Sequence, residues 1–562
     1  MPNFDETRAL KLIYLARERF DAELSDAEIK VLRDSATSQD LPMPGRNDPR
    51  PEVRGEFLRW LATDAEAAPQ IDLKGIRVYS STISNSLDLE NCSLQRKLAI
   101  FCSDCKDRVL LREATTKGVF VYYSSLLGGL DADGTIFHGS FRLNVIESSD
   151  KINLMDAKIY GNLDCRGATL AFDGDALMGD RARIEGGIFL NVDPISKKRF
   201  TCNGTIRFLG AEINGNLVCS SAQLSCTREA LCIDGAKIGG YVFFDREPEF
   251  EEDFECDGEI RLVGAEIAGD IFFYGAKVNQ VSAWNLRVNG DLFWLGVRNS
   301  ERANLILTGS RVKNLHDDVE SLPRPGRLNL NDFSYENLVL HAPPAKHDFA
   351  SGNRPRELGT PVKDRIEWLT LQDAVRRLEP QPWMQLAKLL ESKGDRKGAK
   401  HVIYNFRCLR ADKKSYFPRR WAIFFAWLEE APLRILWTLT ATVALGTLIF
   451  AGGTRSGAMI ETVRLQPNFA SHSRISAHYP TFQPFIYSLE NGLPLVKLGM
   501  DDRWIPDPRH VPQPWFPKHP WLDGLKWLNS YWLLAISRWL LILSGWVQAT
   551  ILIAAVSDRF KK

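Results

Sequence analysis

A segment that returns at a constant spacing occupies the middle of this chain. The stretches DAKIYGNLDCRGATL (156–170), GAEINGNLVCSSAQL (210–224) and GAEIAGDIFFYGAKV (264–278) align without gaps. These stretches start 54 residues apart. A second copy lies inside each interval: RARIEGGIFL (181–190) matches GAKIGGYVFF (235–244), which again starts 54 residues later. Repeats of this length predict a solenoid, in which each unit packs only against its neighbours in sequence.

The pattern inside each copy identifies the secondary structure. It reads small–x–Ile–x–Gly–x–apolar–x–apolar. Apolar residues at every second position are typical of strands, whereas a helix needs a spacing near 3.6 residues. Weaker copies occur upstream, at 80–94 and 123–137. We therefore expect a β-solenoid with one coil per half-unit of about 25–29 residues.

The predicted solenoid has a definite length and two ends. About ten coils between residues 70 and 342 would form a rod roughly 50 Å long at the ~4.8 Å spacing of paired strands. The strand edges at both ends of such a rod need a cover. The segment 1–65 reads as helical, and SDAE (25–28) is a capping box that opens one of its helices. We expect this segment to cap the solenoid.

Charge and cysteine usage exclude several classes of function. The chain has 71 Lys and Arg against 70 Asp and Glu, which argues against nucleic acid as the main partner. Nine of its ten cysteines lie within 92–256, several at repeat positions that elsewhere carry apolar residues, which indicates buried reduced thiols. CSDC (102–105) is the only C-x-x-C, and no second ligand pair of the kind that zinc requires follows it.

Two apolar segments near the C-terminus predict membrane helices. They are ILWTLTATVALGTLIFA (435–451) and, after Arg538, WLLILSGWVQATILIAAVS (539–557). Each approaches the ~20 residues that a helix needs to cross the hydrocarbon. Aromatic and basic residues flank both segments, as at membrane interfaces. The alternative is a pair of core helices in a water-soluble body.

The basic residues around these segments predict an orientation. They lie before the first span and after the second: Arg407, Arg410, Lys413, Lys414, Arg419, Arg420, Arg434, Arg559, Lys561 and Lys562. The positive-inside rule places both termini in the cytoplasm. The first stretch of the chain, MPNFDETRALKLIYLARERF, contains acids and no apolar core, so we expect no cleaved export signal. RRWAIFFAWLEEAP (419–432) is typical of an amphipathic helix that lies on a membrane surface.

A helical connector is predicted between the solenoid and the first span. Residues 380–410 have apolar side chains at helical spacing, interrupted by SKGD (392–395). This pattern predicts a helical hairpin, which resembles a single tetratricopeptide unit and needs another surface to pack on. We expect it to pack against 363–378. Its basic second helix either faces an anionic leaflet or is simply solvated.

The segment FQPFIYSLENGLPLVKLGMDDRW (482–504) lies between the two spans and is too short to cross a bilayer. Three interpretations stay open: a re-entrant half-helix at membrane depth, an amphipathic helix on the outer surface, or an ordinary extracytoplasmic loop. The candidate pore or re-entrant-loop residues are Tyr487, Ser488, Glu490, Asn491, Gly492, Lys497, Gly499, Asp501 and Asp502.

Three resemblances accompany these patterns. The repeat resembles pentapeptide-repeat and related bacterial β-solenoid proteins, which implies stacked coils. YSLENGLPLVKLGMDD (487–502) is similar to the pore loop of two-helix cation channels, although Pro494, Leu495 and Val496 stand at the filter positions and G-Y-G is missing. The solenoid, the QPW hairpin and the tail GWVQATILIA together resemble bacterial membrane proteins that are labelled membrane-associated oxidoreductases.

The prediction is a mainly β chain with four parts. These are an N-terminal helical cap (1–65), a β-solenoid (66–345), a helical hairpin with an interfacial helix (346–430), and a membrane module with two transmembrane helices and a re-entrant-type loop (431–562). No Walker A, G-x-G-x-x-G, G-x-S-x-G or H-E-x-x-H motif occurs, so we expect no cofactor and favour a function other than catalysis.

Three functions are compatible with this organisation. The first is a cytoplasmic binding or sensing surface anchored in a bacterial inner membrane, with a protein or small molecule as its ligand. The second is an oligomeric pore-loop channel that the solenoid gates. The third is a membrane-associated oxidoreductase without a recognisable cofactor motif. We expect the lipid bilayer as a partner, possible self-association, and no nucleic acid.

Overall fold

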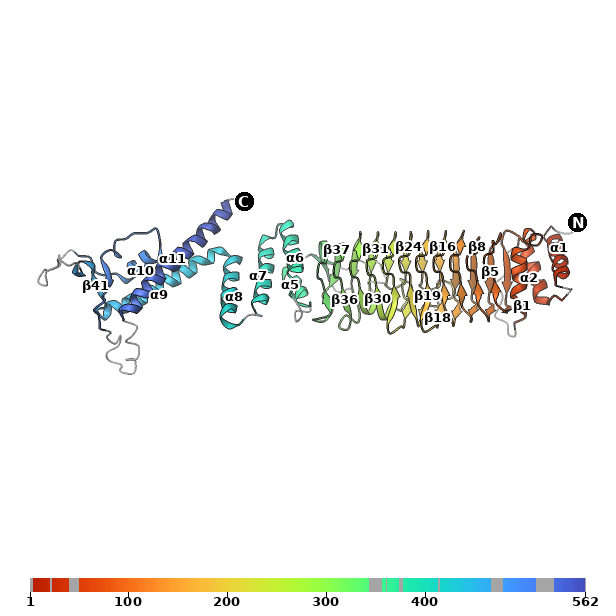
Figure 1. Ribbon diagram of the computed structural model, residues 1–562, viewed down its shortest axis with the longest axis horizontal. Helices are drawn as coiled ribbons and strands as arrows, with labels where there is room; N and C mark the ends of the chain where they lie inside the picture. The colour runs from red at the N-terminus through yellow and green to blue at the C-terminus, as the bar shows by residue number, and fades with distance from the viewer. Residues whose placement is uncertain are drawn as a thin grey trace. The chain divides into compact units, whose positions relative to one another are not determined.

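The structure is a computed structural model that describes residues 4–20, 23–39, 50–342, 356–359, 361–372, 378–412, 415–465, 479–511 and 530–560. The chain divides into two compact units, residues 1–402 and 403–562. The first contains N-terminal helices, a β-solenoid and the helices that follow it, and the second is mainly helical (Figure 1). The fold class predicted from the sequence is confirmed, while the boundaries at 65, 345 and 430 stay predictions.

The solenoid has about 12 coils, compared with the ten expected. Its strands form two sheets of 19 and 21 strands, and neighbouring coils pair in parallel. One coil passes through four short strands, two in each sheet: β16 (Lys158–Ile159), β17 (Leu163–Asp164), β18 (Thr169–Leu170) and β19 (Asp175–Met178). β20 (Arg183–Ile184) then pairs with β16 and begins the next coil.

The register of the strands explains the half-unit in the sequence. Five repeat isoleucines are successive partners in the 21-stranded sheet: Ile159, Ile184, Ile213, Ile238 and Ile267. A shorter and a longer step alternate along this column, so a coil corresponds to a half-unit, as predicted. The extra residues of a longer step include the acidic segment DREPEFEEDF (245–254), which forms a loop between β29 (Val242–Phe243) and β30 (Glu255–Arg261).

An alternating inward column accounts for the period of two coils. The residues before β18 and its successive partners are Ala168, Phe200, Ala222, Phe254 and Ala276, and all five are fully buried. Large and small side chains that alternate along a column fill the interior without voids. The sequence therefore repeats over two coils although each coil has the same backbone path.

The weaker upstream copies lie half a coil out of phase with the main repeat. Ile83 in β3 (Thr82–Ser84) and Leu126 in β10 (Ser125–Leu126) belong to the 19-stranded sheet, whereas Ile159 belongs to the other sheet. Both halves of a coil place alternating apolar residues inward. The same short pattern therefore matches either sheet.

Three helices and one strand cover the first coil. They are α1 (Phe4–Arg19), α2 (Asp26–Ala36), α3 (Gly55–Thr63) and β1 (Glu52–Arg54), which pairs with β3. The predicted capping box is present, since the Glu28 amide donates to Ser25 Oγ at 3.1 Å and the Ser25 amide donates to Glu28 Oε2 at 3.1 Å. The Arg77 amide donates to Ser35 Oγ at 3.1 Å and so joins α2 to the first coil.

The opposite end of the solenoid is covered by helices that follow it. The last parallel strand, β39 (Ser334–His341), pairs on one side with the short antiparallel β40 (Glu357–Gly359). α5 (Val362–Thr370) and α6 (Gln381–Ser392) come next. The Gln381 and Gln385 side chains donate to the backbone carbonyls of Phe333 and Tyr335 at 3.0 and 2.9 Å. These bonds satisfy acceptors that an open strand edge would leave unpaired.

A buried ion pair attaches α5 to the last coils. The Arg365 guanidinium donates to both carboxylate oxygens of Asp317, at 2.6 and 2.7 Å, and each side chain is only 1% exposed. α5 ends at Thr370 and lies within the segment 363–378, against which the hairpin was expected to pack. The predicted hairpin is present as α6 and α7 (Arg396–Asp412), with its turn at 393–395.

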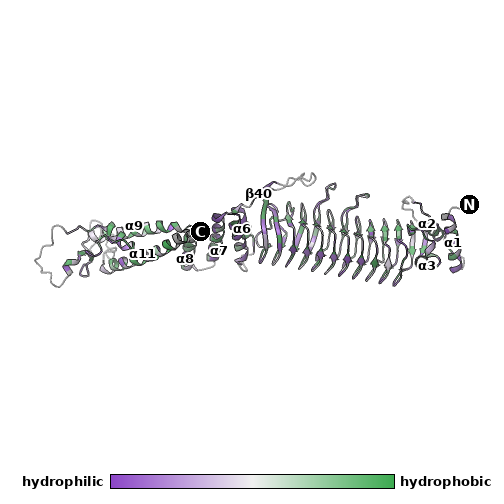
Figure 2. Ribbon diagram, turned by 90° about the horizontal axis from the view of Figure 1, so that it is seen from above, coloured by the Kyte–Doolittle hydropathy of each residue, from purple (hydrophilic) through white to green (hydrophobic). Residues whose placement is uncertain are grey.

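The second unit contains two long apolar helices. α8 (Tyr416–Glu430) leads through the short 3-10 turn η2 (Pro432–Arg434) into α9 (Ile435–Arg455). β41 (Met459–Glu461) pairs with β42 (Trp504–Pro506) in the segment that also holds α10 (Pro484–Gly492), and α11 (Tyr531–Phe560) follows. Figure 2 shows hydrophobic residues along much of α9 and α11.

α9 and α11 are long and apolar enough to cross a membrane. In the most apolar window of each helix, 28% of the residues of α9 and 11% of the residues of α11 are buried. Core helices of a water-soluble body would be mostly buried, so this low burial argues against that alternative. α11 begins at Tyr531, whereas the sequence-based span begins at 539, and the helix therefore includes Arg538.

Candidate functional site between the two apolar helices

α10 lies between α9 and α11 and ends near their midpoints. A Cβ on Gly545, in the middle of α11, would lie 2.3 Å from the Gly492 carbonyl oxygen. A Cβ on Gly492 would lie 3.2 Å from Cγ2 of Val443, which is in the middle of α9. Only glycine permits this approach of the backbone of α10 to α11. α10 therefore ends level with the middle turns of α9 and α11, and its assignment as a re-entrant segment stays a prediction.

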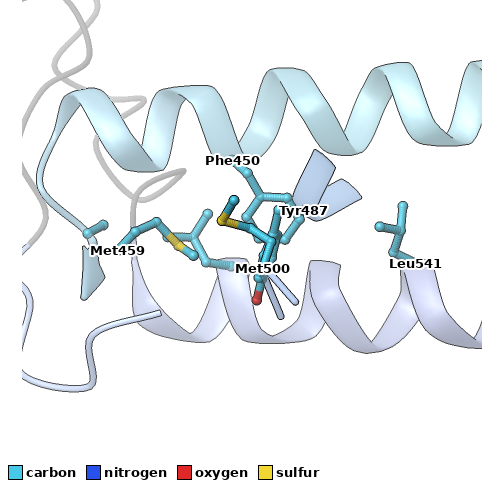
Figure 3. Packing of buried hydrophobic residues seen from close by; sticks show 7 residues of the cluster. Phe450, Met459, Tyr487, Met500 and Leu541 are labelled. Carbon is cyan, nitrogen blue, oxygen red and sulfur yellow. The ribbon is translucent and has the colours of Figure 1, made fainter. Parts of the chain in front are cut away.

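An apolar core joins the three helices (Figure 3). Its buried members are Phe450, Ala458, Met459, Tyr487, Met500, Leu534 and Leu541. The ring of Tyr487 meets that of Phe450 nearly edge-on, with 4.8 Å between their centroids. Tyr487 therefore packs inside the unit together with the side chain of Met500.

The carboxylate of Glu490 closes the loop that follows α10. Its two oxygens accept four consecutive backbone N–H groups, from Leu498 at 3.0 Å, Gly499 at 2.9 Å, Met500 at 2.8 Å and Asp501 at 3.0 Å. Successive N–H groups that converge in this way form an anion-binding nest. Gly499 has φ +77°, a conformation that favours glycine, and so allows the turn.

Arg538 ties this loop to α11. Its Nη2 lies 2.5 Å from Asp501 Oδ1, and its Nε donates to Asn491 Oδ1 at 3.3 Å. Arg538 lies two turns inside α11, and both charged side chains are about a quarter exposed. The guanidinium thus connects the end of α10, the loop after it and α11.

Further polar groups face one another between the helices. Gln548 Nε2 of α11 donates to Thr442 Oγ1 of α9 at 3.1 Å. A Cβ on Gly446 would lie 3.2 Å from Ser488 Oγ, so α9 and α10 are in close contact there. The hydroxyls of Tyr487 and Ser488 are buried and have no hydrogen-bond partner among the described residues.

The residues predicted for this site fall into three groups. Tyr487, Ser488, Asn491 and Gly492 are buried between the helices, and Glu490, Gly499 and Asp501 form the closed loop. Lys497 and Asp502 are exposed and lie outside both groups. Whether any of them lines a pore stays a prediction.

Sequence reasoning missed four residues of this site. They are Gly446, Arg538, Gly545 and Gln548. One signal was available, because Arg538 is the only charged residue from 531 to 557, and a charge within an apolar helix usually marks a functional contact. The glycines carried no comparable signal, since their role depends on which helices meet.

A row of aromatic side chains forms a second candidate site, on the outer face of the 21-stranded sheet. The rings of Phe243, Phe272, Phe293 and His316 stack with centroid distances of 5.0, 4.9 and 4.4 Å. The register extends this row to Phe189, Val218 and Val339. We call these seven partly exposed residues the aromatic column.

A row of charges runs beside the aromatic column. It consists of Arg183, Glu212, Lys237, Glu266 and Arg287, all exposed and alternating in sign. Arg287 and Glu266 are 3.0 Å apart, and Arg183 and Glu212 are 3.5 Å apart. A groove runs along this row from Glu212 to Arg287 and is also lined by Asn214 and Ala268.

The cysteines belong to the structure of the solenoid. All ten are free thiols, and seven are buried, as predicted. Burial raises the pKa of Cys105 to about 12, so its thiol is poorly nucleophilic at neutral pH. No group of three or more His, Cys, Asp or Glu side chains among the described residues is arranged to hold a metal ion.

Comparison with known proteins finds no matching family model, no matching curated protein and no matching solved structure.

Proposed function

We propose that this chain is an integral membrane protein whose solenoid is a docking surface for a protein partner. In this proposal α9 and α11 span a bacterial inner membrane, and both termini are cytoplasmic. The aromatic column is the observation that carries it. Seven partly exposed residues, four of them stacked rings, lie in one straight row on one face.

The length of the aromatic column favours a protein over a small molecule. Six steps between coils at ~4.8 Å give a row about 29 Å long. Small ligands are bound in concave pockets, whereas no residue of the aromatic column lines the groove beside it. Aromatic side chains supply much of the binding energy at protein interfaces. An extended or helical segment of a partner matches this length and chemistry.

The second unit supports the membrane part of the proposal. Exposed residues along α9 and α11 include Leu445, Leu448, Trp539, Leu543 and Trp546, each more than half exposed. Exposed apolar side chains along two long helices are stable against lipid and unfavourable in water.

Site-specific photocrosslinking tests the docking surface. A photoreactive amino acid at Phe272 of the full chain in cells should give a discrete crosslinked product. The matched control is Gln223, which lies on the 19-stranded sheet and points outward. The product should disappear in Phe243→Ser/Phe293→Ser. Equal crosslinking from Gln223, or none from Phe272, would contradict the proposal.

A pore is the second candidate function. Two observations favour it: α10 ends at the midpoints of the two apolar helices, and the Arg538–Asp501 pair lies in the same region. Charged residues inside membrane segments commonly belong to ion or proton pathways. A pore requires several copies of the chain, since the core around Tyr487 fills the space between the helices of one copy.

A further inference from the structure

α8 exposes an aromatic face. Phe417, Trp421, Phe424 and Phe425 fall on one side of the helix at the i, i+4, i+7, i+8 spacing. Phe417 is 76% exposed and Trp421 is 60% exposed. A soluble helix would bury such a face, so these side chains need an apolar environment that the described chain does not supply.

Basic side chains border this face. Arg420 flanks it, with its guanidinium 5.4 Å from the Tyr416 ring centroid, and Arg410 is exposed near the end of α7. Two nearby acids are already paired: Asp412 Oδ1 lies 2.9 Å from Arg419 Nη2, and Glu430 Oε2 lies 2.8 Å from Arg434 Nη1. Residues 407–434 contain seven basic and three acidic residues, so the net charge of this segment is positive.

The turn after α8 sets its direction. η2 alone separates α8 from α9, apart from Ala431. Arg434 Nη1 donates to the Trp427 carbonyl at 2.9 Å, and its guanidinium lies 5.0 Å from the Trp427 ring centroid. α8 runs across the direction of α9 and α11 (Figure 1). A helix on the surface of the bilayer that α9 crosses would have this direction.

We propose that α8 binds the anionic phospholipid surface of the bilayer. The aromatic face enters the boundary between headgroups and acyl chains, while Arg420 and Arg410 contact phosphate groups. The inference rests on the proposed function, in which α9 and α11 span that bilayer. Two observations select lipid over a protein partner: the aromatic face is continuous along the chain with an apolar helix, and its border is positive.

Hydrogen exchange of the full chain in nanodiscs tests this inference. We compare discs of phosphatidylcholine alone with discs of phosphatidylcholine and phosphatidylglycerol mixed two to one. Amides of 416–430 should exchange about tenfold more slowly in the anionic discs. Arg420→Gln should reduce this difference about fivefold, the change expected for one basic residue at an anionic surface. Arg420→Lys should retain it, and Arg183→Gln on the solenoid should leave it unchanged.

The outcomes separate the two proposals. A chain that does not remain with the discs overturns the membrane proposal and this inference together. A chain that inserts, yet exchanges equally fast in both disc types, overturns only the anionic-lipid contact. Protection of α8 by inorganic phosphate in phosphatidylcholine discs would show a free-phosphate site and would also overturn it.

Discussion

Gly215 lies where the backbones of two paired coils approach closely, and this approach requires a residue without a side chain. Its N–H donates to the Gly186 carbonyl at 2.9 Å, and the same bond recurs from Gly240 to Gly215 and from Gly269 to Gly240, each at 3.0 Å. A Cβ on Gly215 would lie 2.7 Å from the Gly186 oxygen. That oxygen belongs to the backbone of a paired coil, so no side-chain rotation relieves the contact.

Gly215→Ala should therefore destabilise the solenoid. The coils must separate locally, and overpacking of this kind costs about 1–3 kcal/mol. Urea unfolding followed by far-UV circular dichroism measures the effect. Glu212→Ala is the control, because Glu212 belongs to the same coil and points outward. Equal midpoints for the two variants would contradict the role of the glycine contact.

The raised pKa of Asp245 predicts how the stability of the solenoid depends on pH. Burial raises its pKa to about 7, the hydrogen bond from Ser220 opposes this shift, and the nearby Glu247 carboxylate adds to it. The ordinary value is 3.8, so the folded chain holds a proton between pH 4 and 7 that the unfolded chain has released. Stability from this group is therefore present at low pH and lost as the pH rises towards 7.

Asp245→Asn should remove this dependence. The free energy of unfolding of the parent chain should fall, relative to the variant, by about 2 kcal/mol between pH 5 and 7. Parallel urea titrations at several pH values give the difference. Glu249→Gln in the same loop is the control, because the Glu249 side chain is 84% exposed. A constant difference between the parent and Asp245→Asn would show that Asp245 titrates normally.

At the scale of elements, the repeat and most of the helices at the ends of the solenoid were predictable, whereas the contacts that attach these helices were not. Ile159, Ile213 and Ile267 recur at a fixed spacing, because every coil imposes the same inward position. Arg365 and Asp317 are 48 residues apart and occur once, so no periodicity connects them. The sequence places Arg538 only at the flank of a span, because its partner Asp501 lies in a loop whose path depends on the packing of α10.

The attachment of α5 predicts a large effect of one substitution. Arg365→Met leaves the buried Asp317 carboxylate without its cation, at a cost of about 3–5 kcal/mol. Hydrogen exchange of β39 in the full chain should become faster. Asp317→Leu/Arg365→Met should restore most of the protection, because neither charge then remains buried.

An exposed ion pair is the matched control for this prediction. Arg324 pairs with Glu301 on the surface of the neighbouring coils, where both side chains are more than 60% exposed. Arg324→Gln should change little, since exposed pairs contribute little to stability. If Arg365→Met behaves like Arg324→Gln, the ion pair does not hold α5 in place.

The Arg538 contacts predict coupling between α10 and α11. Arg538→Gln and Asp501→Asn should each lower the thermal midpoint of the chain in detergent. The double variant should lose less than the sum of the two, with a coupling energy of about 0.5–3 kcal/mol for residues in contact. Lys497→Gln serves as the control, because Lys497 is exposed in the same loop. Strict additivity would mean that the pair does not couple α10 to α11.

At the scale of the whole molecule, the two candidate functions differ in what α10 does. In the docking proposal, α10 packs between α9 and α11 and holds them together through Gly492, Gly545 and the core around Tyr487. In the pore alternative, the loop from 493 to 502 faces a passage shared by several copies. A selective filter needs backbone carbonyls that face the passage. The N–H groups of 498–501 bind Glu490, which fixes the loop within one copy.

The oligomeric state and ion flux of the purified chain decide between them. We expect no closed tetramer or pentamer in detergent and no ion flux in liposomes, because the described core is complete in one copy. Glu490→Gln and Gly499→Ala should then lower the thermal midpoint, since both disturb the loop after α10, and should change no conductance. A closed ring whose flux is abolished by these two variants, and kept in Asp502→Asn, would replace the docking proposal with the pore. Asp502 is the appropriate control because it is exposed and lies just beyond the four amides that Glu490 binds.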